Sequence, residues 1–420
     1  MLPLPDDSRS RLAREVAQQI ARPGTALSGY FYRSPLAYEL ELNQLLLKSW
    51  VYAAHVSELA EPGAFRTLEM GEDSIIVARG EDGELRAFSN SCRHRGARVC
   101  DREHGVARTF VCPYHGWTYG SDGALRGARE MTDAPGFDAD RLGLRQLSLV
   151  EFEGLVFVNA DPAAFDLEQA LEPLRPPLAA YDLPNARIAH QHSYRVQANW
   201  KLCLENYLEC YHCATAHRSY AKMHTLKDPQ EKVQDVLDAM LARSEAVTGV
   251  PGITVDHRRM YEQAPGFGAC ASHQRYGLFE GYLTGSEDGQ PVAPLMGRMQ
   301  GYDGGAGDFQ FGPVSFMLNY PDHCVLYRFL PLGPDDTDMK VVWFVDGSAV
   351  EGVDYQRDRV TWLWHHTTLE DEYIISRNRA GVLSRLYEPG PLQGEFEEAM
   401  MDFHRWYLGA LGAAVEGAAK

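Results

Sequence analysis

Four residues with metal-binding side chains form two short motifs in the first third of the chain. Cys92 and His94 are separated by one residue; about seventeen residues later, Cys112 and His115 are separated by two. Two thiolates and two imidazoles are the ligands of a Rieske [2Fe–2S] cluster, in which the cysteines hold one iron and the histidines the other. Imidazoles raise the reduction potential above that of an all-cysteine cluster, so the cluster can accept electrons and pass them on. A zinc site is the alternative, although zinc ligands usually come as C-x2–4-C and H-x3–5-H pairs.

A second group of candidate ligands lies near the middle of the chain, at Glu209, His212 and His217. On a helix, Glu209 and His212 share one face, whereas His217 does not, so the helix must bend or end between the two histidines. Two histidines and one carboxylate form the facial triad of non-heme Fe(II) oxygenases, which leaves positions open for O2 and substrate. The carboxylate has to come from elsewhere, and the pair Glu370-Asp371 in a predicted long helix is the candidate donor.

The cysteines outside the cluster motif are expected to be reduced thiols of a cytoplasmic protein. Two of them form a C-x-x-C motif, but no βαβ pattern surrounds it, so helix packing is favoured over thioredoxin-like redox chemistry. The six residues are Cys100, Cys203, Cys210, Cys213, Cys270 and Cys324.

The length and charge of the chain limit its class. A chain of 420 residues is too long for one core, so two domains are expected. The formal net charge of −18 argues against nucleic-acid binding; it suits docking to a basic electron-transfer partner, or simply a solvated acidic surface. No apolar run is long enough to span a membrane, and the first residues lack the pattern of a signal peptide.

Short β-rich runs surround the cluster motif. Helices are predicted over residues 6–22 and 36–48, ahead of these runs. Gly/Asp turns separate the runs and are typical of hairpins. The ligand pairs should therefore lie at hairpin tips of a small all-β domain, over residues 45–165. The predicted strands are Phe65–Met70, Ser74–Arg79, Leu85–Ser89 and Leu155–Asn159.

The second half of the chain mixes helices and strands. A Pro-rich stretch over 172–177 is predicted as a linker, and a helix begins at Asn199. Residues 225–310 are polar and Gly-rich, and helix plus long loops is predicted there. Strands are predicted over Ile188–Val196, Val314–Asn319, Cys324–Leu330 and Met339–Val345, and helices over 355–380 and 395–408.

The chain resembles the α subunits of Rieske non-heme iron oxygenases over nearly its whole length. The text from Cys112 to Tyr119, CPYHGWTY, resembles the Rieske signature of ring-hydroxylating oxygenases. Several other stretches are similar to the branch that acts on glycine betaine, choline, carnitine and stachydrine. They are Asn199-Trp-Lys201, Glu205–Cys213, Val350–Tyr355, Glu370-Asp371, Tyr387–Pro391 and Trp406-Tyr407.

The resemblance implies an α+β fold: a small all-β Rieske domain plus a helix-grip catalytic domain with a curved antiparallel sheet around a helix. It implies N-terminal helices over 1–44 packing on the catalytic domain, the Rieske domain over 45–165 and the catalytic domain over 166–420. It favours Asp371 over Glu370 as the third iron ligand. It also places Glu209 as the residue that links the iron to a Rieske histidine of a neighbouring subunit, in a head-to-tail homotrimer.

The expected function is that of a terminal oxygenase component that hydroxylates or N-demethylates a small quaternary ammonium compound with O2. A separate flavin/iron–sulfur reductase must supply electrons from NAD(P)H, because no G-x-G-x-x-G motif follows a predicted strand. The alternatives are a mono- or dioxygenase of an aromatic acid and a Rieske electron carrier without an enzymatic site. A quaternary ammonium substrate calls for an aromatic cage. Candidates, each more often a core residue, are Tyr207, Phe316, Tyr320, Phe329 and Trp364.

Overall fold

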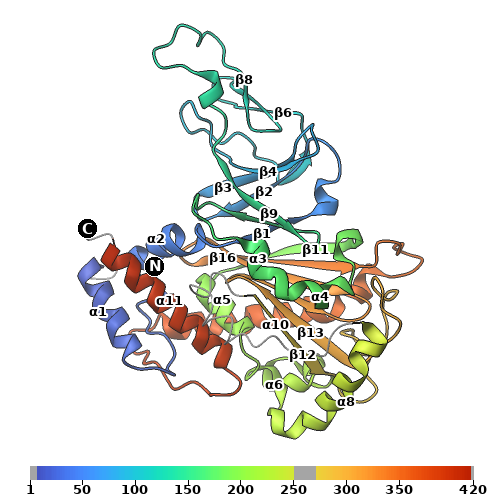
Figure 1. Ribbon diagram of the computed structural model, residues 1–420. Helices are drawn as coiled ribbons and strands as arrows, with labels where there is room; N and C mark the ends of the chain where they lie inside the picture. Colours follow the sequence, from blue (N-terminus) through green and yellow to red (C-terminus); the bar gives the residue numbers. More distant parts are fainter. Residues whose placement is uncertain (1–6, 250–270, 418–420) are drawn as a thin grey trace.

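An all-β part stands on a larger part in which helices cover an antiparallel sheet (Figure 1). The computed structural model describes residues 7–249 and 271–417. Among these residues, no helix is long and apolar enough to cross a membrane.

The all-β part contains a seven-stranded sheet in the order β1-β10-β9-β4-β3-β2-β5 and a three-stranded sheet in the order β6-β7-β8. Hairpins join β2 to β3, β3 to β4, β6 to β7, β7 to β8 and β9 to β10. Gly71 closes the turn between β2 and β3 at a φ of +59°, which glycine adopts without strain. The predicted all-β domain is confirmed, while its exact limits stay a prediction. The strands are β1 (Val51–His55), β2 (Ala64–Met70), β3 (Asp73–Arg79), β4 (Leu85–Ser89), β5 (His104–Val106), β6 (Thr109–Val111), β7 (Thr118–Gly120), β8 (Leu125–Gly127), β9 (Gln146–Phe152) and β10 (Leu155–Asn159).

The larger part is built on a six-stranded sheet in the order β11-β16-β15-β14-β13-β12, with every neighbouring pair antiparallel. Its strands are β11 (Arg187–Val196), β12 (Ala271–Gly277), β13 (Gly305–Phe311), β14 (Ser315–Asn319), β15 (Cys324–Gly333) and β16 (Asp336–Val345).

The strands β12 and β13 correct the sequence analysis, which predicted helix plus long loops over residues 225–310. The helix is present as α8 (Gln230–Thr248), but the loops include two strands. Their sequences, ASHQRYG and GAGDFQF, are poor in β-branched residues. Pairing with β14 decides their conformation, because tertiary context overrides a weak strand propensity.

Both faces of this sheet are buried. On the inner face, Phe316, Tyr327 and Trp343 pack with α5 (Trp200–Tyr207) and the long α10 (Arg357–Val382) in one core. On the outer face, Met317 and Phe344 belong to a second core with α3 (Leu167–Leu171) and α4 (Arg175–Ala179). The predicted helix against a curled antiparallel sheet is confirmed.

The Pro-rich stretch at 172–177 is not a linker, contrary to the prediction. It forms a 3-10 turn, η4 (Glu172–Leu174), that runs into α4. Leu174 and Leu178 are buried in the second core. Proline is compatible with the first turn of a helix, where its missing N–H costs no hydrogen bond, so a Pro-rich sequence does not exclude a packed helix here.

The first and the last described helices pack together at one side of the larger part. Helix α1 (Arg9–Ile20) packs against α11 (Glu398–Gly417), as Figure 1 shows. The remaining helical segments are α2 (Pro35–Leu40), the π-helix η1 (Glu41–Leu46), η2 (Val56–Leu59), η3 (Ala139–Arg141), η5 (Leu183–Asn185), α6 (Cys213–Ala216), α7 (Arg218–Ala221) and η6 (Thr225–Lys227).

Candidate metal centres

The two Cys/His motifs converge at the outer end of the all-β part. Each motif forms a tight turn: Gly96 N–H donates to the Cys92 carbonyl, and Gly116 N–H donates to the Cys112 carbonyl. Both cysteines are buried, whereas His115 is exposed. The Nδ1 atoms of His94 and His115 lie 3.1 Å apart. Two buried thiols beneath two converging imidazoles fit the ligand set of a Rieske cluster.

Neighbouring aromatic residues hold these ligands in place. The Trp117 ring stacks on His94 with 4.9 Å between centroids and 6° between planes. The Tyr119 hydroxyl lies 3.2 Å from Cys92 Sγ and accepts a hydrogen bond from the Arg93 N–H. Burial raises the pKa of the Cys92 thiol, but hydrogen bonds from Tyr119 and from the backbone of His94 outweigh burial and lower it. A lowered pKa favours the thiolate, which is the form that binds metal.

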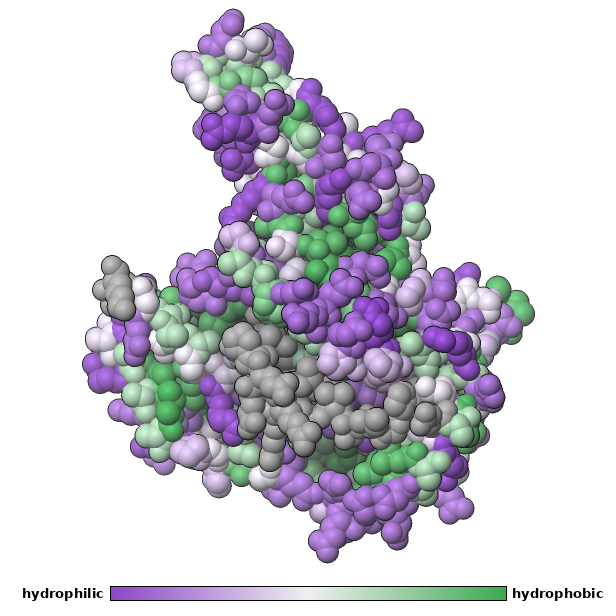
Figure 2. Space-filling view, in the orientation of Figure 1, coloured by the Kyte–Doolittle hydropathy of each residue, from purple (hydrophilic) through white to green (hydrophobic). Residues whose placement is uncertain are grey.

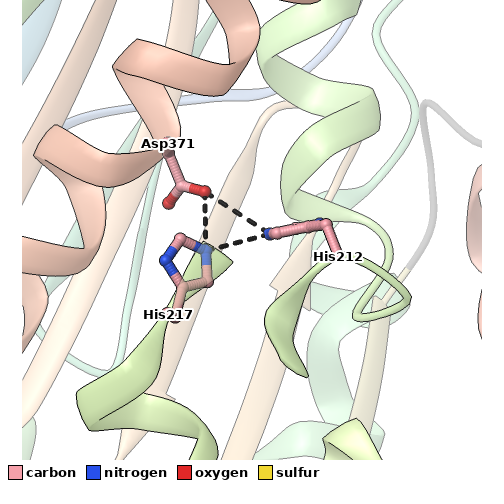
Figure 3. A group of neighbouring side chains, drawn as sticks. All are labelled: His212, His217 and Asp371. Carbon is pink, nitrogen blue, oxygen red and sulfur yellow. Dashed lines mark hydrogen bonds and ion pairs between the residues drawn. The ribbon is translucent and has the colours of Figure 1, made fainter. Parts of the chain in front are cut away.

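The second site brings together His212, His217 and Asp371, as Figure 3 shows. The two Nε2 atoms are 3.0 Å apart, and Asp371 Oδ1 lies 3.4 Å from His212 Nε2 and 3.0 Å from His217 Nε2. Ligands that are each about 2.1 Å from one metal and at right angles to one another are about 3.0 Å apart. The three atoms therefore have the spacing of ligands that share one face of a divalent metal ion.

Glu370 and Asp371 are adjacent on α10 but contact opposite nitrogens of His217. Glu370 Oε2 lies 2.9 Å from Nδ1, on the far side of the ring from Asp371. A carboxylate on the second nitrogen of a metal-binding imidazole fixes its tautomer and orientation. In this geometry Asp371 is the residue placed to bind a metal, and Glu370 is placed to orient His217.

The local structure around Glu209 differs from the prediction. Helix α5 ends at Tyr207, so Glu209 and His212 lie in a turn and not on one helix face. Glu209 stabilises this turn, because its Oε2 accepts hydrogen bonds from the backbone N–H groups of Tyr211 and His212. Its Oε1 lies 2.5 Å from His212 Nδ1. The turn before α6 makes both imidazoles point to one place.

The imidazoles and carboxylates of this site stabilise one another's charged forms. Burial lowers the pKa of His212, but hydrogen bonds to Asp371 and Glu209 outweigh burial and raise it to about 9. Burial raises the pKa of Asp371, but hydrogen bonds to the two imidazoles lower it below its usual value. A cleft of about 350 Å³ reaches the site and is lined in part by Glu205, Glu209 and His212.

Cys210 and Cys213 form a disulfide, which corrects the expectation that they are reduced thiols. The turn that Glu209 closes brings their Cα atoms to 4.9 Å, within the usual range for a disulfide. Cys270 lies outside the described residues. The free cysteines in the described ranges are Cys92, Cys100, Cys112, Cys203 and Cys324.

The candidate cage residues from the sequence lie in one aromatic cluster on the inner face of the large sheet. Tyr207 is central, with ring centroids 4.6 Å from Phe316 and 5.5 Å from Phe329. Trp364 and Tyr320 join the same cluster because other aromatic rings lie in contact with them. Those rings, which the sequence analysis missed, are Tyr220, Tyr327 and His224. Tyr220 stands three residues after His217, and that spacing was the signal that could have found it.

Family models match both parts of the chain. Residues 49–138 match the Rieske [2Fe-2S] domain, and residues 183–413 match the ring hydroxylating alpha subunit (catalytic domain). The glycine betaine monooxygenase oxygenase subunit of Chromohalobacter salexigens is 33% identical over 90% of this chain and 84% of its own length. The chain belongs to the Rieske non-heme iron oxygenase family. It is an enzyme of this family, with a [2Fe–2S] cluster, a mononuclear iron and O2 as co-substrate, so the zinc and carrier-only alternatives are set aside.

Other relatives agree with this assignment. The carnitine monooxygenase oxygenase subunit of Escherichia coli K12 is 38% identical over 46% of this chain and 52% of its own length. The crystal structure of the quaternary ammonium Rieske monooxygenase CntA with L-carnitine has a TM-score of 0.68 at 23% identity, covering 98% of this chain and 99% of that one. Naphthalene 1,2-dioxygenase from a Rhodococcus species has a TM-score of 0.63 at 21% identity, over 96% of this chain and 98% of that one. The two structural likenesses show the fold.

Proposed function

We propose that the chain is the terminal oxygenase component of a monooxygenase that acts on a quaternary ammonium compound such as glycine betaine, carnitine or stachydrine. The observation that carries this proposal is the aromatic cluster beside His217, since the faces of aromatic rings attract quaternary ammonium groups. The glycine betaine and carnitine relatives, by their names, support the same substrate class. Hydroxylation of an N-methyl C–H bond gives a carbinolamine that collapses to the demethylated amine and formaldehyde.

The proposed ligands follow from the two convergent sites. Cys92 and Cys112 would hold one cluster iron, His94 and His115 the other. The ligands of the mononuclear iron would be His212, His217 and Asp371. When bound, the cluster stores single electrons and the mononuclear iron activates O2.

The chain's own residues orient the ligands and exclude water. Glu370 would fix the tautomer of His217, and Glu209 that of His212, because each accepts from the nitrogen opposite the metal side. The aromatic cluster would keep the N-methyl group against the triad and away from bulk water.

Electrons would reach the iron from a neighbouring copy of this chain, in a head-to-tail homotrimer. In Figure 1 the sheet β6-β7-β8, next to the cluster motif, lies at the far end of the molecule from α6 and α10. Exposed Tyr114 lies beside His115, and exposed Leu369 and Tyr373 line a surface hollow of about 460 Å³ next to Glu370. A heterologous contact between these surfaces would close into a ring of three if successive copies were related by a threefold rotation. A solved structure of CntA has given insight into inter-subunit electron transfer in that protein.

Glu209 is the proposed bridge between the two centres. It already contacts His212, and a ring contact would bring the outer nitrogen of a neighbour's His115 to the same carboxylate.

The electrons would come from NAD(P)H through a separate flavin/iron–sulfur reductase. Most of the visible surface is hydrophilic, but hydrophobic areas lie on the all-β part (Figure 2). Such exposed hydrophobic areas can bind a protein partner.

Turnover with a surrogate reductase tests the substrate class. The purified, iron-loaded enzyme is incubated with NADH and O2 and with glycine betaine, carnitine or stachydrine, and formaldehyde and the demethylated amine are measured. Formation of both products in equal amounts is expected for at least one compound. Benzoate-type acids are the matched comparison; oxidation of these acids without any methylammonium turnover would favour the alternative, an oxygenase of an aromatic acid.

A further inference from the structure

The aromatic cluster forms a continuous wall on the inner face of the large sheet. We call its six members the aromatic wall: Tyr207, Tyr220, Phe316, Tyr327, Phe329 and Trp364. Tyr327 lies 5.4 Å from Tyr207 and 6.0 Å from Trp364, and Trp364 lies 5.7 Å from Tyr220, between ring centroids. Tyr220 lies 6.3 Å from His217. The wall therefore begins at the candidate iron site and extends along β14 and β15.

Asp308 is on the same face of the sheet as this wall. It pairs with Leu318 across β13 and β14, and opposite residues of an antiparallel pair point to one face. Phe316 is two residues from Leu318 and shares that face, whereas Phe309 and Phe311 belong to the core behind the sheet. Asp308 is thus a carboxylate between Leu318 on β14 and Gln274 on β12, on the face that carries the aromatic wall.

The carboxylate of Asp308 has no cationic partner in the described ranges 7–249 and 271–417. Burial raises its pKa to about 7, and the nearby Tyr207 hydroxyl lowers it only in part. A carboxylate in such a place costs stability, because burial without a counter-charge disfavours the ionised form.

Three other buried polar groups on this face have only weak hydrogen-bond partners among the described residues. The Tyr207 hydroxyl contacts Asp308, the Tyr276 hydroxyl contacts Tyr220 and the Trp364 indole contacts Tyr320, but none of these contacts has the geometry of a well-formed hydrogen bond. The charge of Asp308 raises the pKa of both Tyr207 and Tyr276, so its carboxylate lies near these two hydroxyls. Most buried polar atoms in native proteins have well-formed hydrogen bonds, so a group of poorly satisfied ones calls for a ligand or another explanation.

We propose that Asp308 is the counter-ion of the substrate's positively charged nitrogen and selects cations over neutral molecules of the same shape. This inference deepens the proposed function and rests on it. Aromatic faces attract a cation through their quadrupole, and a carboxylate at the same place adds a full negative charge in a medium of low polarity. A neutral molecule would leave the carboxylate unpaired, and an anion would be repelled.

The test replaces the charge and keeps the shape, with Asp308→Asn. For the methylammonium compound that the wild type demethylates, KM is expected to rise about 10- to 100-fold with a smaller change in kcat, since an attraction present in the bound ground state is lost. Binding of the carbon analogue is measured by calorimetry without O2; for glycine betaine it is 3,3-dimethylbutanoate. Its affinity is expected to stay the same or increase, so the preference for the cation falls at least about tenfold.

Two further variants make the result decisive. Asp336→Asn makes the same change on β16, where Asp336 pairs with exposed Arg195, and is expected to leave both affinities unchanged. Asp308→Glu keeps the charge and should keep the preference for the cation even if KM changes. It also replaces the first variant if Asp308→Asn fails to fold, and loss of the preference in Asp308→Glu would then count against the proposal.

The role of Asp308 and the proposed function would be contradicted by different results. If the wild type demethylates a methylammonium compound and Asp308→Asn retains the full preference for the cation, Asp308 is not the counter-ion and the proposed function stands. If the wild type oxidises none of these compounds, the proposed function itself is wrong.

Discussion

At the residue scale, each histidine of the mononuclear site is held by a carboxylate on the nitrogen that faces away from the triad. Glu209 contacts Nδ1 of His212 and Glu370 contacts Nδ1 of His217, which leaves both Nε2 atoms for Asp371 and a metal. The sequence offered Glu370 and Asp371 as neighbours, and only their positions on α10 assign them different partners. An adjacent pair on a helix points about 100° apart, so the two carboxylates cannot act at the same atom.

His212→Ala should remove the mononuclear iron and keep the cluster. The wild type should contain about three irons per chain, two in the cluster and one at the triad, and the variant about two. Iron analysis and the visible absorption of the cluster measure the two sites separately. His192→Ala, an exposed histidine on β11, is the control and should keep all the iron. Retention of three irons in His212→Ala would show that this histidine is not a ligand.

At the scale of elements, a buried ion pair joins three segments that are distant in sequence. Lys201 on α5 and Glu41 on η1 are both fully buried, with 2.7 Å between Nζ and Oε1. Trp200 and Tyr407 also donate hydrogen bonds to Glu41, which brings α11 into the same contact. Helix α5 leads directly into the turn of Glu209, so this pair fixes the start of the segment that carries the candidate ligands.

Lys201→Met should destabilise the fold by about 3–5 kcal/mol, because it leaves Glu41 buried without its counter-charge. The double variant with Glu41→Gln should recover part of this loss, since no charge then remains buried. Denaturant midpoints of the cluster-loaded protein measure both. Arg86→Met breaks an exposed pair with Asp82 and should change the midpoint little. Equal losses in the single and double variants would mean that packing, and not the buried charge, causes the effect.

At the scale of the whole molecule, the cluster and the iron site lie in different parts of the chain. In Figure 1 the all-β part carries the cluster motif away from α5, α6 and α10. The hollow beside Glu370 lies on α10, in the larger part, whereas the sheet β6-β7-β8 stands at the other end of the molecule; this separation is the physical reason for proposing a ring of copies.

Mixed assemblies should reveal electron transfer between subunits. A chain with Cys112→Ser lacks the cluster and a chain with His212→Ala lacks the iron, so each is expected to be inactive alone. Co-assembled at equal amounts, they should recover about a quarter of the wild-type activity per chain, because one in four junctions joins an intact cluster to an intact iron site.

The matched control mixes wild-type chains with chains that carry both substitutions. Transfer between chains predicts about a quarter of the wild-type activity in this mixture, and transfer within a chain predicts about half. Mixed assemblies of verified size that remain inactive in the first experiment would contradict the proposed ring.

The sequence by itself determined the chemistry and most of the elements. Residue types and spacing were enough to predict the cluster motif at Cys92–His115 and the His212 and His217 pair. Both groups combine metal-binding side chains with short separations along the chain. Strands with strong β propensity, such as β3 and β15, were also predictable, since local preference and tertiary pairing agree there.

Only the tertiary structure decided what depends on pairing between distant segments. Strand β13 has little propensity of its own, and its pairing with β14 turns Asp308 to the inner face. The turn at Glu209 depends on backbone hydrogen bonds to a carboxylate that propensity does not describe, and it also brings Cys210 and Cys213 into a disulfide. Sequence spacing can name metal ligands, but the counter-charges and walls around a substrate come from strands that meet only after folding.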